Sequence, residues 1–315
     1  MTDELARGAV HEITAGPYTA RITEVGATLD ALELDGRALI LSSPPGGPML
    51  FYRGAIVAPW PNRIADGAYT YDGENLQAPI NEVERHTALH GLVSFQRYTP
   101  VTENGDEGGE DTGNALTLET ELYPQTGYPF HLHLQVRYVL DAQTGLTTTV
   151  RARNLGTRTL PYGVCPHPYL VAGTEPMADW SLRLDAGTVL EVTEDRLLPT
   201  GTSPVEGGSA YDFAAGKVIG AQQIDTALTD LARDGGIASV RVTSPSGTGV
   251  EISFDERCPW VQLHTGDRPG EPENDRLGLA VEPMTCPPDA FRSGTDVVHL
   301  AAGDAHEASW QITGF

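Results

Sequence analysis

Hydrophobic and polar residues alternate over long stretches of this chain, which predicts β-strands. In residues 132–140 the apolar positions are Leu132, Leu134, Val136, Tyr138 and Leu140. A period of two places one face of a strand in the core. Residues 146–152, rich in β-branched side chains, follow a turn at Gly145 and are expected to pair with the strand 132–140. Residues 239–242 and 250–254 are expected to form another hairpin.

Turn signals support the same interpretation. Asp35-Gly36 and Asp72-Gly73 each separate short apolar runs, as in tight hairpins. Helical periodicity is scarce, and its best candidate is residues 226–233, which stop before Gly235-Gly236. Many short strands without alternating helices predict an all-β antiparallel sandwich or barrel. No change in composition marks a linker, so residues 1–315 are expected to form one domain.

The net charge of the chain argues against several classes of binding partner. The chain has 20 Lys+Arg against 43 Asp+Glu, a net charge of −23, and Lys217 is its single lysine. Such a chain is a poor ligand for nucleic acids and anionic membranes, and it offers pyridoxal phosphate no lysine except Lys217. With no visible signal peptide or membrane-length apolar run, a cytoplasmic protein is expected.

The sequence motifs of several common enzyme classes are absent from this chain. The chain has no Walker loop, no zincin pair of histidines and no Gly-x-Ser-x-Gly elbow. Its three cysteines form no zinc or disulfide pattern and are expected to be small buried side chains. The acidic, glycine-rich residues 103–114 lack EF-hand spacing and are expected to be a solvated hairpin loop. These absences favour an acid–base mechanism without a cofactor.

Four segments carry residues that are poor structural choices for strands. Asn62-Arg63 follows two prolines, His90 precedes Gly91, His167 stands between two prolines, and Glu282 ends an apolar run. Taken alone, Arg63 is more simply explained as an exposed loop arginine and His90 as a packed histidine. A buried carboxylate, however, lowers stability unless it is hydrogen-bonded or used in chemistry, and burial would raise its pKa.

Together these segments resemble the aldose 1-epimerase (galactose mutarotase) family. In chain order the motifs are Asn62-Arg63-Ile64 with Gly67, Leu89-His90-Gly91, His167-Pro168-Tyr169, Ile224-Asp225, Gln262 in the strand around it, and Glu282-Pro283 with Asp289. The resemblance runs from about Val10 to Ile312. The chain departs from the family pattern at Pro166, where an asparagine is usual, at His264, where a tyrosine is usual, and at Tyr98, where a tryptophan is usual.

The resemblance implies a large antiparallel β-sandwich of the galactose mutarotase type, with its active site on a concave face. It also implies Glu282 as general base and His167 as general acid, on opposite sides of the anomeric centre. His90 and Arg63 would stabilise the oxygen whose charge changes. Hydroxyls of the sugar would be held by Asn62, Asp225 and Gln262, with Tyr169 lining the pocket. A nearby carboxylate is expected to raise the pKa of His167.

The activity implied is interconversion of the α- and β-anomers of a free hexose, a small-molecule substrate. Two alternatives stay open: an epimerase for phosphorylated hexoses, with Arg85 and Arg97 near His90, and a carbohydrate-binding protein without activity. No cofactor is expected. No metal is expected either, because neither His90 nor His167 has a second ligand at metal-site spacing in the sequence. The protein is expected to be a monomer or a homodimer.

Overall fold

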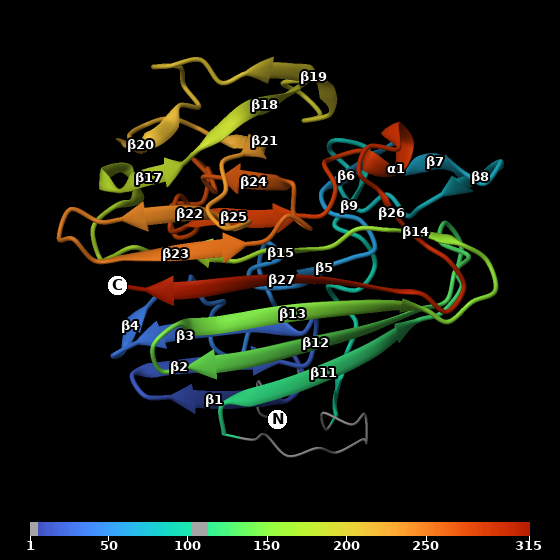
Figure 1. Ribbon diagram of the computed structural model, residues 1–315, viewed down its shortest axis with the longest axis horizontal. Helices are drawn as coiled ribbons and strands as arrows, with labels where there is room; N and C mark the ends of the chain where they lie inside the picture. The colour runs from blue at the N-terminus through green and yellow to red at the C-terminus, as the bar shows by residue number, and fades with distance from the viewer. Residues whose placement is uncertain (1–5, 102–112) are drawn as a thin grey trace.

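Nearly all of the regular structure is β-strand (Figure 1). The computed structural model describes residues 6–101 and 113–315, so most of the acidic segment 103–114 lies outside the described residues. The largest sheet has nine strands, in the order β10-β11-β12-β13-β27-β23-β22-β17-β20. They are β10 (Thr99–Val101), β11 (Ala115–Leu122), β12 (Leu132–Asp141), β13 (Gly145–Asn154), β27 (Ala305–Gly314), β23 (Gly249–Phe254), β22 (Ala238–Thr243), β17 (Ser181–Leu184) and β20 (Phe213–Val218).

A second sheet has six strands, in the order β16-β25-β24-β21-β18-β19, and a third has four strands in chain order. The six are β16 (Tyr169–Leu170), β25 (Leu279–Met284), β24 (Trp260–His264), β21 (Asp225–Leu231), β18 (Ala186–Val192) and β19 (Pro199–Pro204). The four are β1 (Val10–Ala15), β2 (Tyr18–Thr23), β3 (Thr28–Leu34) and β4 (Arg37–Ala38). In Figure 1 the blue strands β1 and β2 lie beside β11 and β12.

Short strand pairs and short helical segments complete the described fold. The pairs are β5 (Ile56–Val57) with β15 (Cys165–Pro166), β6 (Arg63–Ala65) with β9 (Thr87–Leu89), β7 (Ala68–Tyr71) with β8 (Glu74–Gln77), and β14 (Leu160–Tyr162) with β26 (Val298–Leu300). The helices are α1 (Ala290–Ser293) and a 3-10 turn at Met177–Asp179. None of the helices in the described ranges has the length and apolar character needed to cross a membrane.

Every strand pairing found in the sheets is antiparallel, which confirms the predicted fold class. Along β12 the alternation is complete, with the apolar residues buried and the intervening ones partly exposed. The hairpins predicted at Asp35-Gly36, at Asp72-Gly73 and between β22 and β23 are also present. One apolar cluster includes Ile22 of β2, Val136 of β12 and Leu263 of β24, so the three larger sheets share a core.

The predicted helix at residues 226–233 is wrong, because this segment is strand β21. Thr226, Ala227 and Leu228 are buried in succession, since β21 lies inside the six-stranded sheet between β24 and β18. A strand covered on both faces has no polar–apolar alternation, so its pattern cannot be told from that of a buried helix.

Candidate active site

The six-stranded sheet presents two rows of side chains on one face. Residues directly opposite each other on neighbouring antiparallel strands project to the same side of a sheet. Gln262 of β24 lies opposite Glu282 of β25, which forms the first row. The second row crosses four strands and consists of Tyr169, Ala280, His264 and Asp225. Predicted residues from distant parts of the sequence are therefore neighbours on this face.

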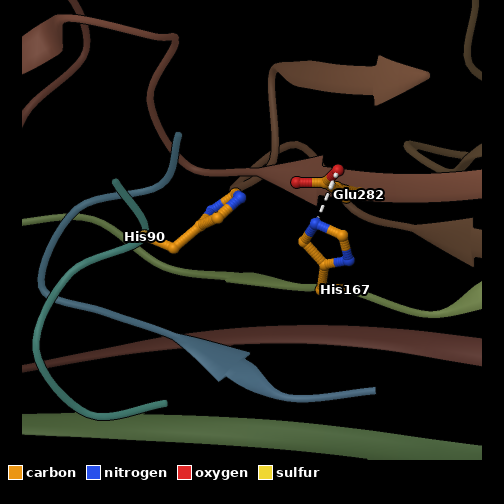
Figure 2. Close-up of side chains that lie close together, drawn as sticks. All are labelled: His90, His167 and Glu282. Carbon is orange, nitrogen blue, oxygen red and sulfur yellow. Dashed lines mark ion pairs between the residues drawn. The ribbon is translucent and has the colours of Figure 1, made fainter. Parts of the chain in front are cut away.

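Glu282 and His167 form a buried pair. Nε2 of His167 lies 3.3 Å from Oε1 of Glu282, and the two side chains are 5% and 2% exposed (Figure 2). The thiol of Cys165 is 3.9 Å from the other carboxylate oxygen. The next positions along the strands are the apolar Trp260 and Met284, which keep water from this end of the row. The two side chains thus contact each other directly, and their placement on opposite sides of an anomeric centre stays a prediction.

The backbone of His167 is fixed on both sides. Its N–H donates to the carbonyl of Ala55 at 3.1 Å, and its carbonyl accepts the N–H of Gly54 at 2.8 Å. The flanking Pro166 and Pro168 restrict their own φ angles and donate no backbone hydrogen bond. The imidazole therefore projects from a rigid support toward Glu282.

His90 lies at the edge of the same group, with its ring centroid 4.9 Å from that of His167. Its φ of 57° is left-handed, a conformation that costs a non-glycine residue about 1 kcal/mol or more. The turn is held by a hydrogen bond from the His90 N–H to the carbonyl of Asn62 at 2.8 Å. At Gly91 a Cβ would lie 2.0 Å from the carbonyl oxygen of Ala58, so only glycine fits beside the histidine.

Arg63 is buried, which excludes the explanation of an exposed loop arginine. Its Nε and Nη2 donate to the two carboxylate oxygens of Glu82 at 2.8 and 2.9 Å, and its Nη1 donates to the side-chain oxygen of Asn62 at 3.2 Å. The fork of two parallel bonds fixes the plane of the guanidinium. Arg63 thus adds a fixed positive charge to the cavity that contains Glu282.

Asp225 and Gln262 also contact each other. Nε2 of Gln262 donates to Asp225 at 2.7 Å, and Nδ1 of His264 lies 3.7 Å from the other oxygen of Asp225. The amide oxygen of Gln262 is buried, and among the described residues it has no hydrogen-bond partner. A hydroxyl group of a ligand is the kind of donor that would satisfy it.

Burial controls the protonation of the pair. It raises the pKa of Glu282 well above its usual value, with Asp225 adding to the effect and Arg63 opposing it. It lowers the pKa of His167 to about 3, helped by His264. The expectation that a carboxylate raises the pKa of His167 is wrong here, because desolvation of the imidazolium outweighs the attraction. Burial, His167 and Arg63 likewise hold the pKa of His90 well below its usual value.

These side chains surround a cavity of about 340 Å³. All but one of the predicted site residues line it, namely Asn62, Arg63, His90, His167, Tyr169, Asp225 and Glu282, and the exception, Gln262, contacts Asp225. Its wall also includes residues that the sequence analysis did not assign to the site, among them Tyr52, Glu82 and Arg268. The sequence around these residues carries no informative motif. A buried arginine needs a carboxylate partner, however, so a partner for Arg63 could have been predicted if its burial had been known.

The same group also has the composition of a metal site. One potential ligand atom from each of His90, His167 and Glu282 lies within 4.8 Å of the others. The sequence argument against a metal relied on spacing along the chain, and that argument is wrong, because the fold brings ligands from three separate elements together. Spacing rules apply only to ligands within one helix, hairpin or loop.

Comparisons with known proteins agree over the length of the chain. A family model described as aldose 1-epimerase matches residues 10–313. An uncharacterized protein of Escherichia coli (strain K12), YihR, is 35% identical over 314 residues, which cover 100% of this chain and 96% of YihR. Galactose mutarotase of Rattus norvegicus is 32% identical over 169 residues, which are 51% of this chain and 45% of that protein.

Solved structures match the fold. A GalM/aldose epimerase homologue from C. elegans has a TM-score of 0.82 at 20% identity, and the match covers 98% of each chain. Galactose 1-epimerase from Lactobacillus acidophilus NCFM has a TM-score of 0.77 at 21% identity, covering 97% of this chain and 94% of that one. At these identities the structures show the fold alone, and they confirm the predicted galactose mutarotase-like sandwich.

Proposed function

Because this chain belongs to the aldose 1-epimerase family, as its motifs predicted, we propose that it interconverts the α- and β-anomers of a free hexose. The observation that carries the proposal is the contact between Glu282 and His167, 3.3 Å apart in the wall of the cavity. Mutarotation requires removal of a proton from the hydroxyl on C1 and addition of a proton to the ring oxygen. Both oxygens are bonded to C1, so two adjacent side chains can reach them.

The ring opens in one balanced step. Glu282 accepts the proton of the C1 hydroxyl, the bond between C1 and the ring oxygen breaks, and His167 gives its proton to that oxygen. The open aldehyde rotates about the bond between C1 and C2, and the reverse transfers close the ring from the other face. No net proton is gained or lost.

One proton shared by the pair is sufficient for this cycle. In the free protein, burial favours the neutral form with the proton on Glu282, and the contact with His167 gives that proton a direct path to the imidazole. Arg63 favours the ionised carboxylate, and the fixed cation would also stabilise negative charge that develops on a substrate oxygen. His90, whose ring centroid lies 4.9 Å from that of His167, would contact the same oxygen.

The test is the rate of mutarotation of freshly dissolved α-glucose and α-galactose, followed by polarimetry. Glu282→Gln and His167→Asn should each lower kcat by about a hundredfold or more, and the double variant should be little worse than the worse single one. Asp225→Ala and Gln262→Ala should mainly raise KM. Prolonged chelation should leave the rate unchanged, since the steps require only side-chain acids and bases.

Wild-type-like turnover by Glu282→Gln would end this proposal. If the wild-type protein bound sugars but left their mutarotation rate unchanged, the alternative of a binding protein would replace it. If chelation abolished the rate and zinc restored it, the three-ligand group of His90, His167 and Glu282 would be a metal centre.

One observation favours the alternative of an anionic hexose. The guanidinium carbon of Arg268 lies 3.4 Å from the centroid of the Phe51 ring, on the wall of the same cavity. Within the described part of the chain, its guanidinium has no carboxylate partner. A phosphorylated hexose would supply one. If kcat/KM for glucose 6-phosphate exceeds that for glucose and Arg268→Gln removes the difference, the substrate is the phosphosugar.

A further inference from the structure

A turn with an unusual backbone forms part of the cavity wall. In residues 51–54, just before β5, Phe51 and Tyr52 have φ angles of 52° and 57°. Both angles lie in the left-handed region, which is unfavourable for large side chains. Both residues line the cavity that contains Glu282 and His167. Strained backbone of this kind is concentrated at functional sites, so these two side chains call for a functional explanation.

Contacts on several sides hold this turn in its strained form. The N–H of Gly54 donates to the carbonyl of His167 at 2.8 Å, and its carbonyl accepts the N–H of Leu29 at 2.9 Å. A Cβ at Gly54 would lie 2.0 Å from the carbonyl oxygen of Leu29, so the turn is packed closely on β3. The carbonyl of Tyr52 accepts the N–H of Ala55 at 3.0 Å. The turn therefore cannot relax without displacing β3 and the backbone of His167.

The ring of Tyr52 packs on the two histidines of the site. Its centroid lies 4.6 Å from that of His90 and 6.2 Å from that of His167. The exposed ring of Phe95 packs edge-on against Tyr52 at 5.3 Å and shields it from solvent. In the described structure, Nδ1 of His90 is buried without a hydrogen-bond partner. No hydrogen bond from this nitrogen orients the imidazole, so its orientation depends on packing against Tyr52 and His167.

The hydroxyl of Tyr52 has an unused donor. It accepts a hydrogen bond of 3.1 Å from Nδ2 of Asn81, which is itself tied to the backbone of Leu89. Burial and the nearby carboxylate of Glu82 raise the pKa of Tyr52, so the hydroxyl keeps its proton. A phenolic hydroxyl can donate as well as accept, and among the described residues this proton has no acceptor. Because Tyr52 lines the cavity, an oxygen of a bound sugar is a suitable acceptor.

We propose that Tyr52 is a further residue of the active site. Its ring holds the imidazole of His90 in place, and its hydroxyl donates a hydrogen bond to a sugar hydroxyl that does not react. The inference rests on the proposed mutarotase function and adds a residue that the sequence motifs did not indicate. The two roles can be separated, because Tyr52→Phe removes only the hydroxyl and Tyr52→Leu removes the ring as well.

The first experiment tests the hydroxyl. In the mutarotation of α-glucose and α-galactose, Tyr52→Phe should raise KM by about fivefold for at least one sugar and change kcat by less than about twofold. A bond to a hydroxyl that does not react contributes equally to the ground state and the transition state. Tyr123→Phe is the matched control, because Tyr123 is exposed, lies outside the cavity wall and should leave KM unchanged. A wild-type KM for both sugars in Tyr52→Phe overturns this role.

The second experiment tests the ring. Tyr52→Leu should lower kcat by about tenfold relative to Tyr52→Phe, because His90 would lose its position beside the oxygen whose charge changes. Tyr123→Leu is the control for loss of an aromatic ring and should preserve kcat. A Tyr52→Leu protein with a lower Tm but the kcat of Tyr52→Phe would show that the ring only packs. If Tyr52→Leu fails to fold, Tyr52→Met, which is also flexible and apolar, tests the same point.

The inference and the proposed function can fail separately. If the wild type accelerates mutarotation and both Tyr52 variants match it, the inference is wrong and the proposed function stands. If the wild type leaves the mutarotation rates unchanged, the proposed function is wrong, and the Kd for each sugar, measured by calorimetry, tests the hydroxyl directly. Tyr52→Phe should then weaken binding by about fivefold. Equal affinity of the two proteins, or no binding by the wild type, would overturn the inference as well.

Discussion

At the scale of single residues, burial controls the charge of Glu282 and His167. Both side chains are almost completely buried, and burial opposes charge on each of them. The two residues were predicted as a pair from the resemblance of their motifs to the aldose 1-epimerase family. The sequence did not allow their protonation to be predicted, because that depends on Trp260, Met284 and the other side chains packed around them.

The first prediction concerns the pH dependence of catalysis. Between the lowered pKa of His167, about 3, and the raised pKa of Glu282, the pair holds one proton, which is the state that ring opening requires. The kcat/KM for α-glucose should therefore show no acidic limb near pH 6.5, about where an ordinary imidazole titrates. Initial rates in a series of buffers from about pH 4.5 to about pH 8 measure this. An acidic limb centred near an ordinary imidazole pKa would contradict it.

The second prediction concerns stability. In the folded chain Glu282 keeps a proton that it releases on unfolding once the pH exceeds about 4.5, so the free energy of unfolding falls as the pH rises through that value toward the folded pKa. Glu282→Gln removes this cost, and its amide can still donate to His167. Its Tm should exceed that of the wild type by roughly 2 °C or more at pH 8, and by less near pH 5.

Thermal melts at the two pH values give the comparison. Glu206→Gln, at an exposed position, is the matched control and should shift Tm little at either pH. A Glu282→Gln protein that is less stable than the wild type at pH 8 would show that the carboxyl group has mainly a structural role.

At the scale of elements, the site is assembled from a sheet and three turns. The sheet supplies Asp225, Gln262 and Glu282 in fixed register, and its side-chain rows follow from pairing alone. The alternating strand β12 was predictable because one face is polar, whereas the doubly covered β21 was predicted as a helix. Pairing between strands far apart in sequence was not predictable from the residues, so the nearness of His167 and Glu282 was expected only from the family resemblance.

The third prediction concerns the turn before β9, which carries Glu82. This carboxylate accepts both bonds that orient Arg63 and a further bond of 2.5 Å from the hydroxyl of Thr87. Glu82→Gln leaves one acceptor oxygen for two guanidinium donors, so Arg63 should lose its fixed plane. We expect kcat to fall by about tenfold with a smaller change in KM, because Arg63 would act on the charge that changes in the reaction.

Steady-state rates of Glu82→Gln and of the exposed neighbouring variant Glu84→Gln provide the comparison. Disruption of a buried ion pair also costs about 3 to 5 kcal/mol of stability, so rates must be measured well below the Tm of the variant. A change confined to Tm and KM, with kcat preserved, would leave Glu82 a structural residue.

At the scale of the whole molecule, the net charge of the chain does not determine the electrostatics of the buried site. The chain has a net charge of −23, and within the described residues most charged groups are at least partly exposed. Exposed charges interact through water and salt. Arg63, by contrast, is held in the buried wall of the cavity by Glu82. The net charge of the chain therefore says little about the cavity, whose wall has Arg63, Arg85 and Arg268 together with the carboxyl groups of Glu82, Asp225, Asp267 and Glu282.

The fourth prediction concerns the response of the fold to salt. At neutral pH the excess of carboxylates repels itself, and unfolding relieves this repulsion by moving the charges apart. Salt screens the repulsion over a Debye length of about 10 Å at 0.1 M, so Tm should rise as sodium chloride is increased at pH 8. Near the isoelectric point of about 4.6 the excess charge is gone, and the rise should disappear. Screening also weakens the surface ion pairs, such as Arg158 with Glu74, but exposed pairs of this kind contribute about 0 to 1 kcal/mol each. A Tm that falls with salt at pH 8 would mean that those pairs outweigh the repulsion.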